Sequence, residues 1–151
     1  MELNVDAQAL LKTFMSMPDK VKLKVARQAL RQGAVVVKKY AQANVRASES
    51  SEASGVLEKS IQVAKFKEQN GRVRYAVRIK PKSVNERKRD GQGKPVRVGL
   101  YAAVLNWGKA NQKPWHWLTN AAKEHVPEVV AAARQGFQKN LDAAVKEAGG
   151  K

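Results

Sequence analysis

The sequence predicts an α+β fold, in which long helices pack on one face of a small antiparallel β-sheet that carries a basic, flexible loop. Apolar residues recur every three or four positions over residues 20–47 and again over 126–144, which is the period of an amphipathic helix. Residues 72–80 instead alternate between apolar and charged side chains, and they follow an Asn-Gly pair that is typical of a hairpin turn. The length of 151 residues suits one domain, residues 1–151.

Two helices are expected before the sheet. Residues 5–15 are amphipathic, and Pro18 then breaks the chain. The helix over residues 20–47 is expected to bury one apolar stripe. The stripe consists of Leu23, Ala26, Leu30, Gly33, Val37 and Tyr40. A coiled coil between molecules is the alternative, but a glycine in the stripe favours packing on the sheet of the same chain. Residues 47–54 are small and polar, and we expect a mobile linker there.

The predicted hairpin joins strands over residues 61–66 and 72–80. The core side of its second strand consists of Val73, Tyr75, Val77 and Ile79, and the outer side of Arg72, Arg74, Ala76, Arg78 and Lys80. Residues 81–95 have no periodicity and are rich in Lys, Arg, Gly and Pro, so we expect a mobile basic loop. Residues 96–98 are then expected to form a third short strand.

All three tryptophans fall within residues 100–122. The aromatic residues of this stretch are Tyr101, Trp107, Trp115 and Trp117. Aromatic side chains bury the most area and make up only 6% of the chain, so the core is expected to form around them. Gly108 suits a sharp turn and Pro114 the approach to a helix over 117–124. The last helix is expected to bury Val126, Val130, Ala133, Phe137, Leu141 and Ala144.

Three motifs stand in a definite order along the chain. They are Ser-Gly-Val-Leu-Glu-Lys-Ser-Ile at 54–61, Tyr-Ala-Ala-Val-Leu-Asn-Trp-Gly-Lys at 101–109 and Pro-Trp-His-Trp-Leu-Thr-Asn-Ala at 114–121. With the long helix and the hairpin, this order resembles the neck proteins of tailed bacteriophages, the tail-completion or head–tail joining family typified by gene product ten of a lambda-like phage. The residues that carry the resemblance are Gly55, Leu57, Ile61, Tyr101, Trp107, Gly108, Pro114, Trp115 and Trp117. The chain departs from the family pattern at Asn106, where glutamate is usual, and at Lys109, where threonine is usual.

The resemblance implies a structural virion protein, with the residues above as its core motif. Such a protein would form a homo-oligomeric ring, expected to be a hexamer that matches the tail. The ring would sit at the head–tail junction or complete the head-proximal end of the tail. Its partners would be other phage neck and tail proteins, with duplex DNA in the channel, and it would enter the virion after assembly in the host cytoplasm.

The sequence contains no pattern that is typical of an enzyme. It has no cysteine, and neither His116 nor His125 has a carboxylate or a second histidine at metal-ligand spacing. The serines of the linker have no base nearby, so we expect no catalysis, no metal and no cofactor. No apolar run of about 18 residues or signal peptide is present, so we expect cytoplasmic synthesis and no membrane span.

The net charge of +16 predicts attraction to a polyanion, either duplex DNA or an acidic protein surface. A contiguous basic surface is expected from Lys65, Lys67, Arg72, Arg74, Arg78, Arg87, Lys88 and Arg89. The alternative is that these residues form only the solvent side of a half-exposed sheet. The second functional hypothesis is a non-specific double-stranded nucleic-acid-binding protein of a mobile element. Tyr75 is expected on the core side, which argues against a platform for single strands.

Overall fold

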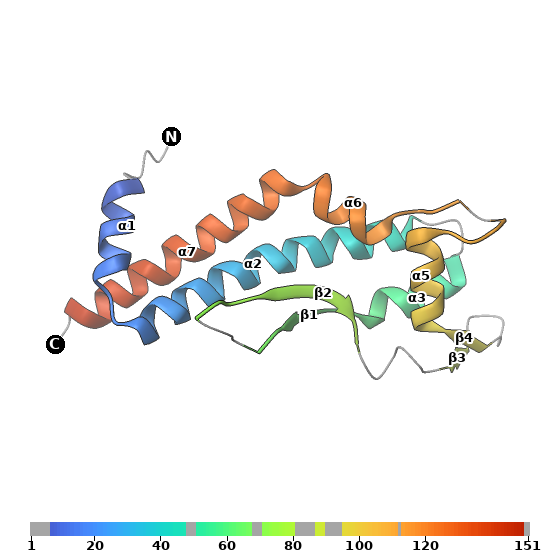
Figure 1. Cartoon of the computed structure of the whole chain (residues 1–151), viewed down its shortest axis with the longest axis horizontal. Coiled ribbons are helices and arrows are strands. Elements are labelled where there is room, and N and C mark those ends of the chain that lie inside the picture. The colour runs from blue at the N-terminus through green and yellow to red at the C-terminus, as the bar shows by residue number, and fades with distance from the viewer. Residues whose placement is uncertain are drawn as a thin grey trace.

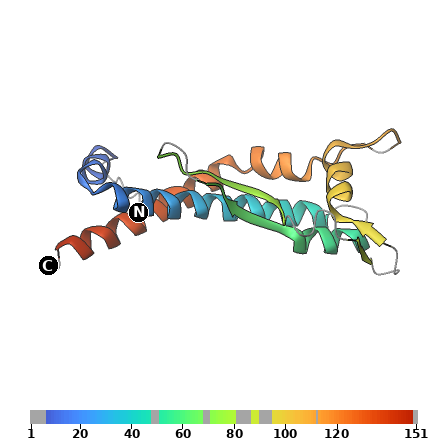
Figure 2. The same cartoon turned by 60° about the horizontal axis from the view of Figure 1, so that its bottom comes forward.

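The computed structural model describes residues 7–47, 51–67, 71–80, 87–89, 95–111 and 113–149. Figure 1 shows an elongated molecule built around helix α2 (Asp19–Arg46), with helix α7 (Val126–Gly149) and a β-hairpin along different sides of it. Both chain ends lie towards one end of the molecule, and helix α5 (Val98–Trp107) lies at the other (Figures 1 and 2). Most of the described residues are helical, and a small two-stranded antiparallel sheet lies along α2, so the predicted α+β class is confirmed.

The two N-terminal helices lie close to their predicted positions. Helix α1 spans Ala7–Ser16, and α2 begins directly after Pro18, whose φ of −59° and ψ of 145° turn the chain between the two helices. The Phe14 ring lies 5.2 Å from the Phe137 ring of α7, measured between ring centroids. This contact ties α1 to the last helix.

Helices α2 and α7 approach each other closely at glycines. A Cβ atom added at Gly33 of α2 would lie 3.2 Å from the carbonyl oxygen of Val129. A Cβ atom added at Gly136 of α7 would lie 3.3 Å from the Cα atom of Ala29. Without a side chain at these two positions, the two helix backbones can pack against each other directly.

The predicted apolar stripes of the two long helices are partly wrong. The buried residues of α2 are Val25, Ala29, Gly33, Ala41 and Val45. Leu30 of the predicted stripe is 43% exposed, and Val126 and Val130 of α7 are also exposed. Helix α2 is the central element and contacts α7, the hairpin and helix α6 (Trp117–Lys123). Its apolar residues therefore spread around the helix, which a single stripe does not describe.

The predicted hairpin is confirmed, with shorter strands. Strand β1 spans Ile61–Lys65 and pairs antiparallel with β2, Tyr75–Ile79, in a register that sets Ile61 opposite Ile79. One more backbone hydrogen bond, from the Phe66 N–H to the Arg74 carbonyl at 3.0 Å, continues the pairing toward the turn. Gly71 has φ of 70°, as a hairpin turn requires. The predicted alternation is confirmed as well, since Arg78 of β2 and Arg74 just before it are exposed, while Val77 and Ile79 pack on the core.

Two segments that were expected to be loops contain regular structure. Helix α3 spans Ser51–Ser60, so the expected linker over 47–54 already contains the first turn of a helix; residues 48–50 lie outside the described residues. Within the expected basic loop, β3 (Arg87–Arg89) pairs antiparallel with β4 (Pro95–Arg97). The third strand expected over 96–98 is present as β4, in a sheet separate from the first hairpin. Regular spacing of apolar residues cannot identify such short strands.

The main core lies where α2, α3, β1, α5 and helix α6 (Trp117–Lys123) meet. Its buried residues are Ala41, Val45, Leu57, Ile61, Val98, Ala102, Leu105, Trp117 and Ala121. Leu57 and Ile61 of the first motif are therefore core residues, as expected. The helix predicted over 117–124 is confirmed, and α7 begins beside Pro127, as predicted.

An ion pair links the end of α2 to α3. The Arg46 guanidinium donates a hydrogen bond of 2.5 Å to the Glu58 carboxylate, and this bond holds the pKa of Glu58 below its ordinary value against the opposing effect of burial. Because the pKa of Glu58 is lowered in the folded state, the ion pair stabilises the protein at pH values above the ordinary glutamate pKa. This stabilisation is lost as the pH falls through the pKa that Glu58 has in the folded protein.

We expect Glu58→Gln to lower the melting temperature near neutral pH, because it removes the ion pair with Arg46. The decrease should be small, because the Arg46 side chain is largely exposed. The difference from the wild type should shrink as the pH falls below the ordinary pKa of glutamate, because the wild type then loses the contribution of the ion pair. Thermal unfolding followed by circular dichroism at several pH values measures this. Glu124→Gln, at an exposed position, is the control. A difference that stays constant with pH would show that the ion pair does not contribute.

Candidate functional site

The three tryptophans have different environments, so the expectation of one aromatic core is wrong. Trp117 is 3% exposed, and its indole Nε1–H donates a 3.0 Å hydrogen bond to the Ala102 carbonyl. Trp115 is 41% exposed, and its Nε1–H donates to the Asn44 carbonyl at 3.0 Å. Trp107, at the end of α5, is 72% exposed. Only Trp117 belongs to the main core.

Helix α5 is apolar on all sides but packs on only one. Its buried residues are Val98, Ala102, Leu105 and Asn106. The opposite face carries Leu100, Ala103, Val104 and Trp107, at the spacing of neighbours along a helix surface, and we name these four residues the α5 outer face. Leu100 is 62% exposed and Trp107 is 72% exposed. The sequence signal for this surface is the lack of any charged residue from position 98 to 108.

Asn106, which replaces the usual glutamate of the motif, has a structural role here. It is buried, and its Oδ1 accepts a 3.2 Å hydrogen bond from the Leu118 N–H. Its Nδ2 donates to the Thr119 hydroxyl at 3.5 Å. A neutral amide can donate and accept at once, so Asn106 links α5 to α6 without the cost of burying a charge.

Gly108 ends α5 in the sharp turn that the sequence predicts. Its φ of 78° and ψ of −176° lie in a region that only glycine adopts readily. We expect Gly108→Ala to lower the free energy of unfolding by about 1–3 kcal/mol, the usual cost of such strain. Urea denaturation measures this change. Gly55→Ala is the control, because α3 leaves open space around that position. Equal stability of Gly108→Ala and the wild type would contradict the strain argument.

The histidines pack or lie at the surface, as expected. The His125 ring stacks on Tyr40, with 3.3 Å between ring centroids, and its Nδ1 lies 3.6 Å from a carboxylate oxygen of Glu128. His116 is exposed in the left-handed conformation, with φ of 53°. Within the described ranges no three histidine or acidic side chains gather as metal ligands would.

The pairing of the hairpin divides the predicted basic surface. Arg78 of β2 and Arg74, just before this strand, lie on one face of the hairpin, where the Arg78 guanidinium carbon lies 5.8 Å from the centroid of the Phe66 ring. The register sets Lys65 opposite Tyr75, so Lys65 belongs to the other face of the hairpin. Lys67 and Arg72 are exposed beyond the paired strands. The remaining three residues, Arg87, Lys88 and Arg89, form β3 of the separate sheet, and their side chains lie outside the described part of the structure.

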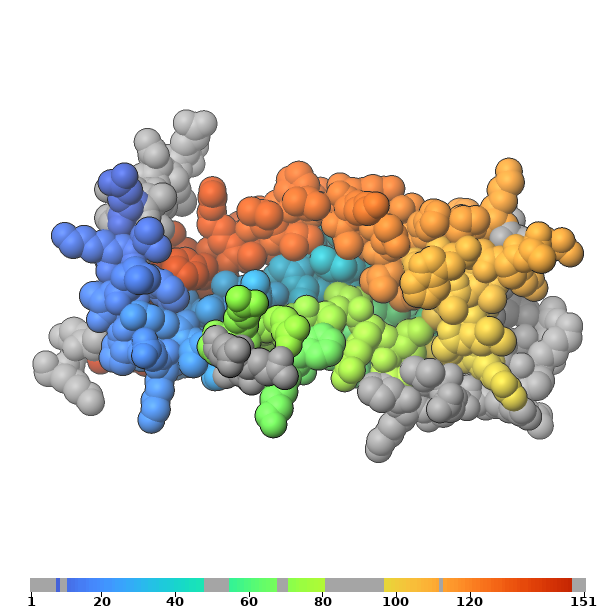
Figure 3. All heavy atoms as spheres, in the orientation of Figure 1, coloured from blue at the N-terminus to red at the C-terminus, as the bar shows by residue number. Residues whose placement is uncertain are grey.

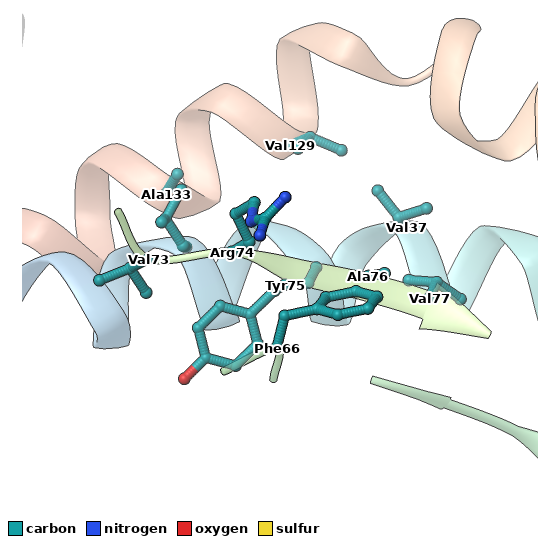
Figure 4. Close-up of a pocket in the computed structure, with 12 residues that line it drawn as sticks. Val37, Phe66, Val73, Arg74, Tyr75, Ala76, Val77, Val129 and Ala133 are labelled. Atoms are coloured by element: carbon teal, nitrogen blue, oxygen red, sulfur yellow. The ribbon is translucent and has the colours of Figure 1, made fainter. Parts of the chain in front are cut away.

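A groove of about 550 Å³ runs between α2, β2 and α7. Figure 4 shows the side chains that line it. The apolar ones include Leu30, Val37, Phe66, Val73, Val77, Val129 and Ala133. Among the described lining residues only Arg74 carries a charge, so the groove offers no acid–base pair for catalysis.

The sequence profile of the HK97-gp10_like family, described as "Bacteriophage HK97-gp10, putative tail-component", matches residues 8–108, more than half of the chain. The chain belongs to this family. The predicted resemblance to phage tail-completion proteins is therefore confirmed at the level of the family. The comparisons with curated proteins and with solved structures give no match.

The region that matches the HK97-gp10-like family runs from α1 to the end of α5. It contains the first motif and all but the last residue of the second, including the α5 outer face and the turn at Gly108. The third motif, over residues 114–121, lies beyond the match and stays a prediction. None of the described helices is both long enough and apolar enough to cross a membrane.

Proposed function

We propose that this HK97-gp10-like protein is a structural part of the phage neck, which forms a ring at the head–tail junction or completes the head-proximal end of the tail. The observation that carries the proposal is the family match over residues 8–108. The α5 outer face supports it, because exposed apolar surface on a small protein usually marks a contact with another protein. Contacts of this kind are what a structural subunit needs.

The ring would consist of identical subunits, six if it follows the symmetry of the tail, and it would contact other neck and tail proteins. In this arrangement the exposed Arg74 and Arg78 of the hairpin would face either duplex DNA in the channel or an acidic neighbour. Contacts of arginine with DNA phosphates depend on charge rather than on base sequence. The protein would be a component of the virion, assembled in the host cytoplasm, with a structural rather than an enzymatic role.

Electron microscopy of particles from a lysate that lacks this gene tests the proposal. We expect filled heads that lie apart from tails, or tails of irregular length, and restoration of joined virions by a plasmid copy of the gene. Intact, normally joined virions in the absence of the gene would contradict a role at the neck.

The net charge of +16 favours a second candidate, non-specific binding of double-stranded nucleic acid. This function requires tight duplex binding by the isolated subunit, with an affinity that falls steeply as salt increases. Titration of a labelled duplex at several salt concentrations distinguishes the candidates. A neck subunit is expected to bind DNA weakly until the ring has formed.

A further inference from the structure

The α5 outer face is the exposed apolar surface of the molecule that most clearly indicates a contact with another protein. A helix that is apolar all round is normally buried on every side. Here one side is buried in the core, while Leu100 and Trp107, two turns apart, remain largely exposed. Helix α5 lies at the end of the molecule opposite α1 (Figures 1 and 3). Tryptophan is among the residues that most often dominate the energy of a protein interface.

The charged residues that flank this face along the chain are all basic. From Pro95 to Lys123 the chain contains no acidic residue. Arg97 precedes α5, while Lys109 and Lys113 follow it, and all three are exposed. An apolar centre with a rim of cations is complementary to a surface with apolar residues inside an acidic rim.

Among the acidic side chains that the structure describes, Glu124 and Asp142 are exposed, 18 positions apart in the sequence, and the others already have a basic neighbour. Asp19, Glu58, Glu128 and Glu147 each lie beside a basic side chain of the same molecule. Two copies that met through this same face would set their basic residues Arg97, Lys109 and Lys113 against each other. Charge therefore favours a different protein over a second copy at this face.

We propose that the α5 outer face binds an acidic segment, apolar along one side, of a different protein of the neck or tail. This inference rests on the proposed function and names the chemistry of one partner. Trp107 and Leu100 would insert between the apolar side chains of the segment, while Arg97, Lys109 and Lys113 would pair with its carboxylates.

Photo-crosslinking in assembled particles tests this proposal. A phage that lacks the gene is complemented with a copy that carries benzoylphenylalanine in place of Trp107, and purified particles are irradiated and analysed by mass spectrometry. We expect a crosslink to a segment of another virion protein in which acidic residues outnumber basic ones. The control carries the same group in place of Val130, which is also exposed but lies on α7, and should give no crosslink to that segment.

Charge reversal of the rim tests the electrostatic part. The triple change Arg97→Glu, Lys109→Glu and Lys113→Glu should lower the yield of the crosslink at position 107 by at least about tenfold. Lys139→Glu, a single reversal at an exposed position of α7, should leave the yield unchanged. Circular dichroism of the purified variants verifies that each of them is folded.

Three results would overturn the inference: a crosslink to a second copy of this chain, a crosslink to DNA, or a crosslink to a segment without excess acidic residues. An unchanged yield after charge reversal, or no crosslink at all, would overturn it too. Failure of the proposed function looks different, because the protein would then be missing from the purified particles. A protein that is present in the particles but crosslinks only to itself would leave the neck function intact and refute the partner.

Discussion

Trp117→Ala is expected to lower the free energy of unfolding by about 3–5 kcal/mol, the range for removing a large aromatic side chain from a core. Trp117 is 3% exposed and packs where α2, α5 and α6 meet. The change removes its apolar contacts and the hydrogen bond from Nε1–H to the Ala102 carbonyl. Urea denaturation followed by circular dichroism measures the loss.

Trp107→Ala is the matched control, because it deletes the same side chain at a position that is 72% exposed. We expect it to change the free energy of unfolding by less than about 0.5 kcal/mol, as is usual for surface positions. Equal losses for the two variants would contradict the burial of Trp117 and the exposure of Trp107. The control also shows that a loss of function in Trp107 variants is not a loss of folding.

Gly136→Leu is expected to destabilise the protein by about 1–3 kcal/mol, through overpacking where α7 crosses α2. A Cβ atom at this position would lie 2.9 Å from Gln32 Cγ and 3.3 Å from Ala29 Cα, which is part of the α2 backbone. A leucine side chain needs still more room, so the two helices would have to separate. The urea midpoint and the melting temperature measure this effect.

Gly55→Leu separates the steric effect from the intrinsic preference of leucine for helices. Both glycines lie in helices, and leucine gains up to about 1 kcal/mol over glycine at such positions. Nothing lies within 4 Å of a Cβ atom at Gly55, so this variant should be as stable as the wild type or more stable. If Gly136→Leu behaves in the same way, the close packing of α2 and α7 is not a constraint on the fold.

Part of the candidate site could be predicted from the sequence. The turn at Gly108 follows from a glycine after an aromatic residue, and the family follows from the order of the three motifs. The division of the basic residues between the two faces of the hairpin was harder to predict. It depends on the register of the two strands, which sets Lys65 opposite Tyr75 and so on the other face from Arg74 and Arg78. The exposure of Trp107 was missed, since apolar character alone does not distinguish a core residue from one at an interface.

The sequence by itself determined the features that depend on neighbours along the chain. These are the two long helices, the hairpin with its alternating β2 strand, and the glycine turn after α5. Each arises from the backbone preference or periodicity of a short segment, so local order is enough.

Only the tertiary structure decided which apolar residues are buried. Trp115 donates to the carbonyl of Asn44, and Trp117 to that of Ala102, so the environment of each depends on helices distant in sequence. Helix α2 likewise buries Val25 and Ala29, because α7 packs on that side, while Leu30 lines an open groove. Whether an apolar residue is buried depends on all the elements that pack around it. The apolar stripe of one helix does not indicate how many other elements will pack against that helix.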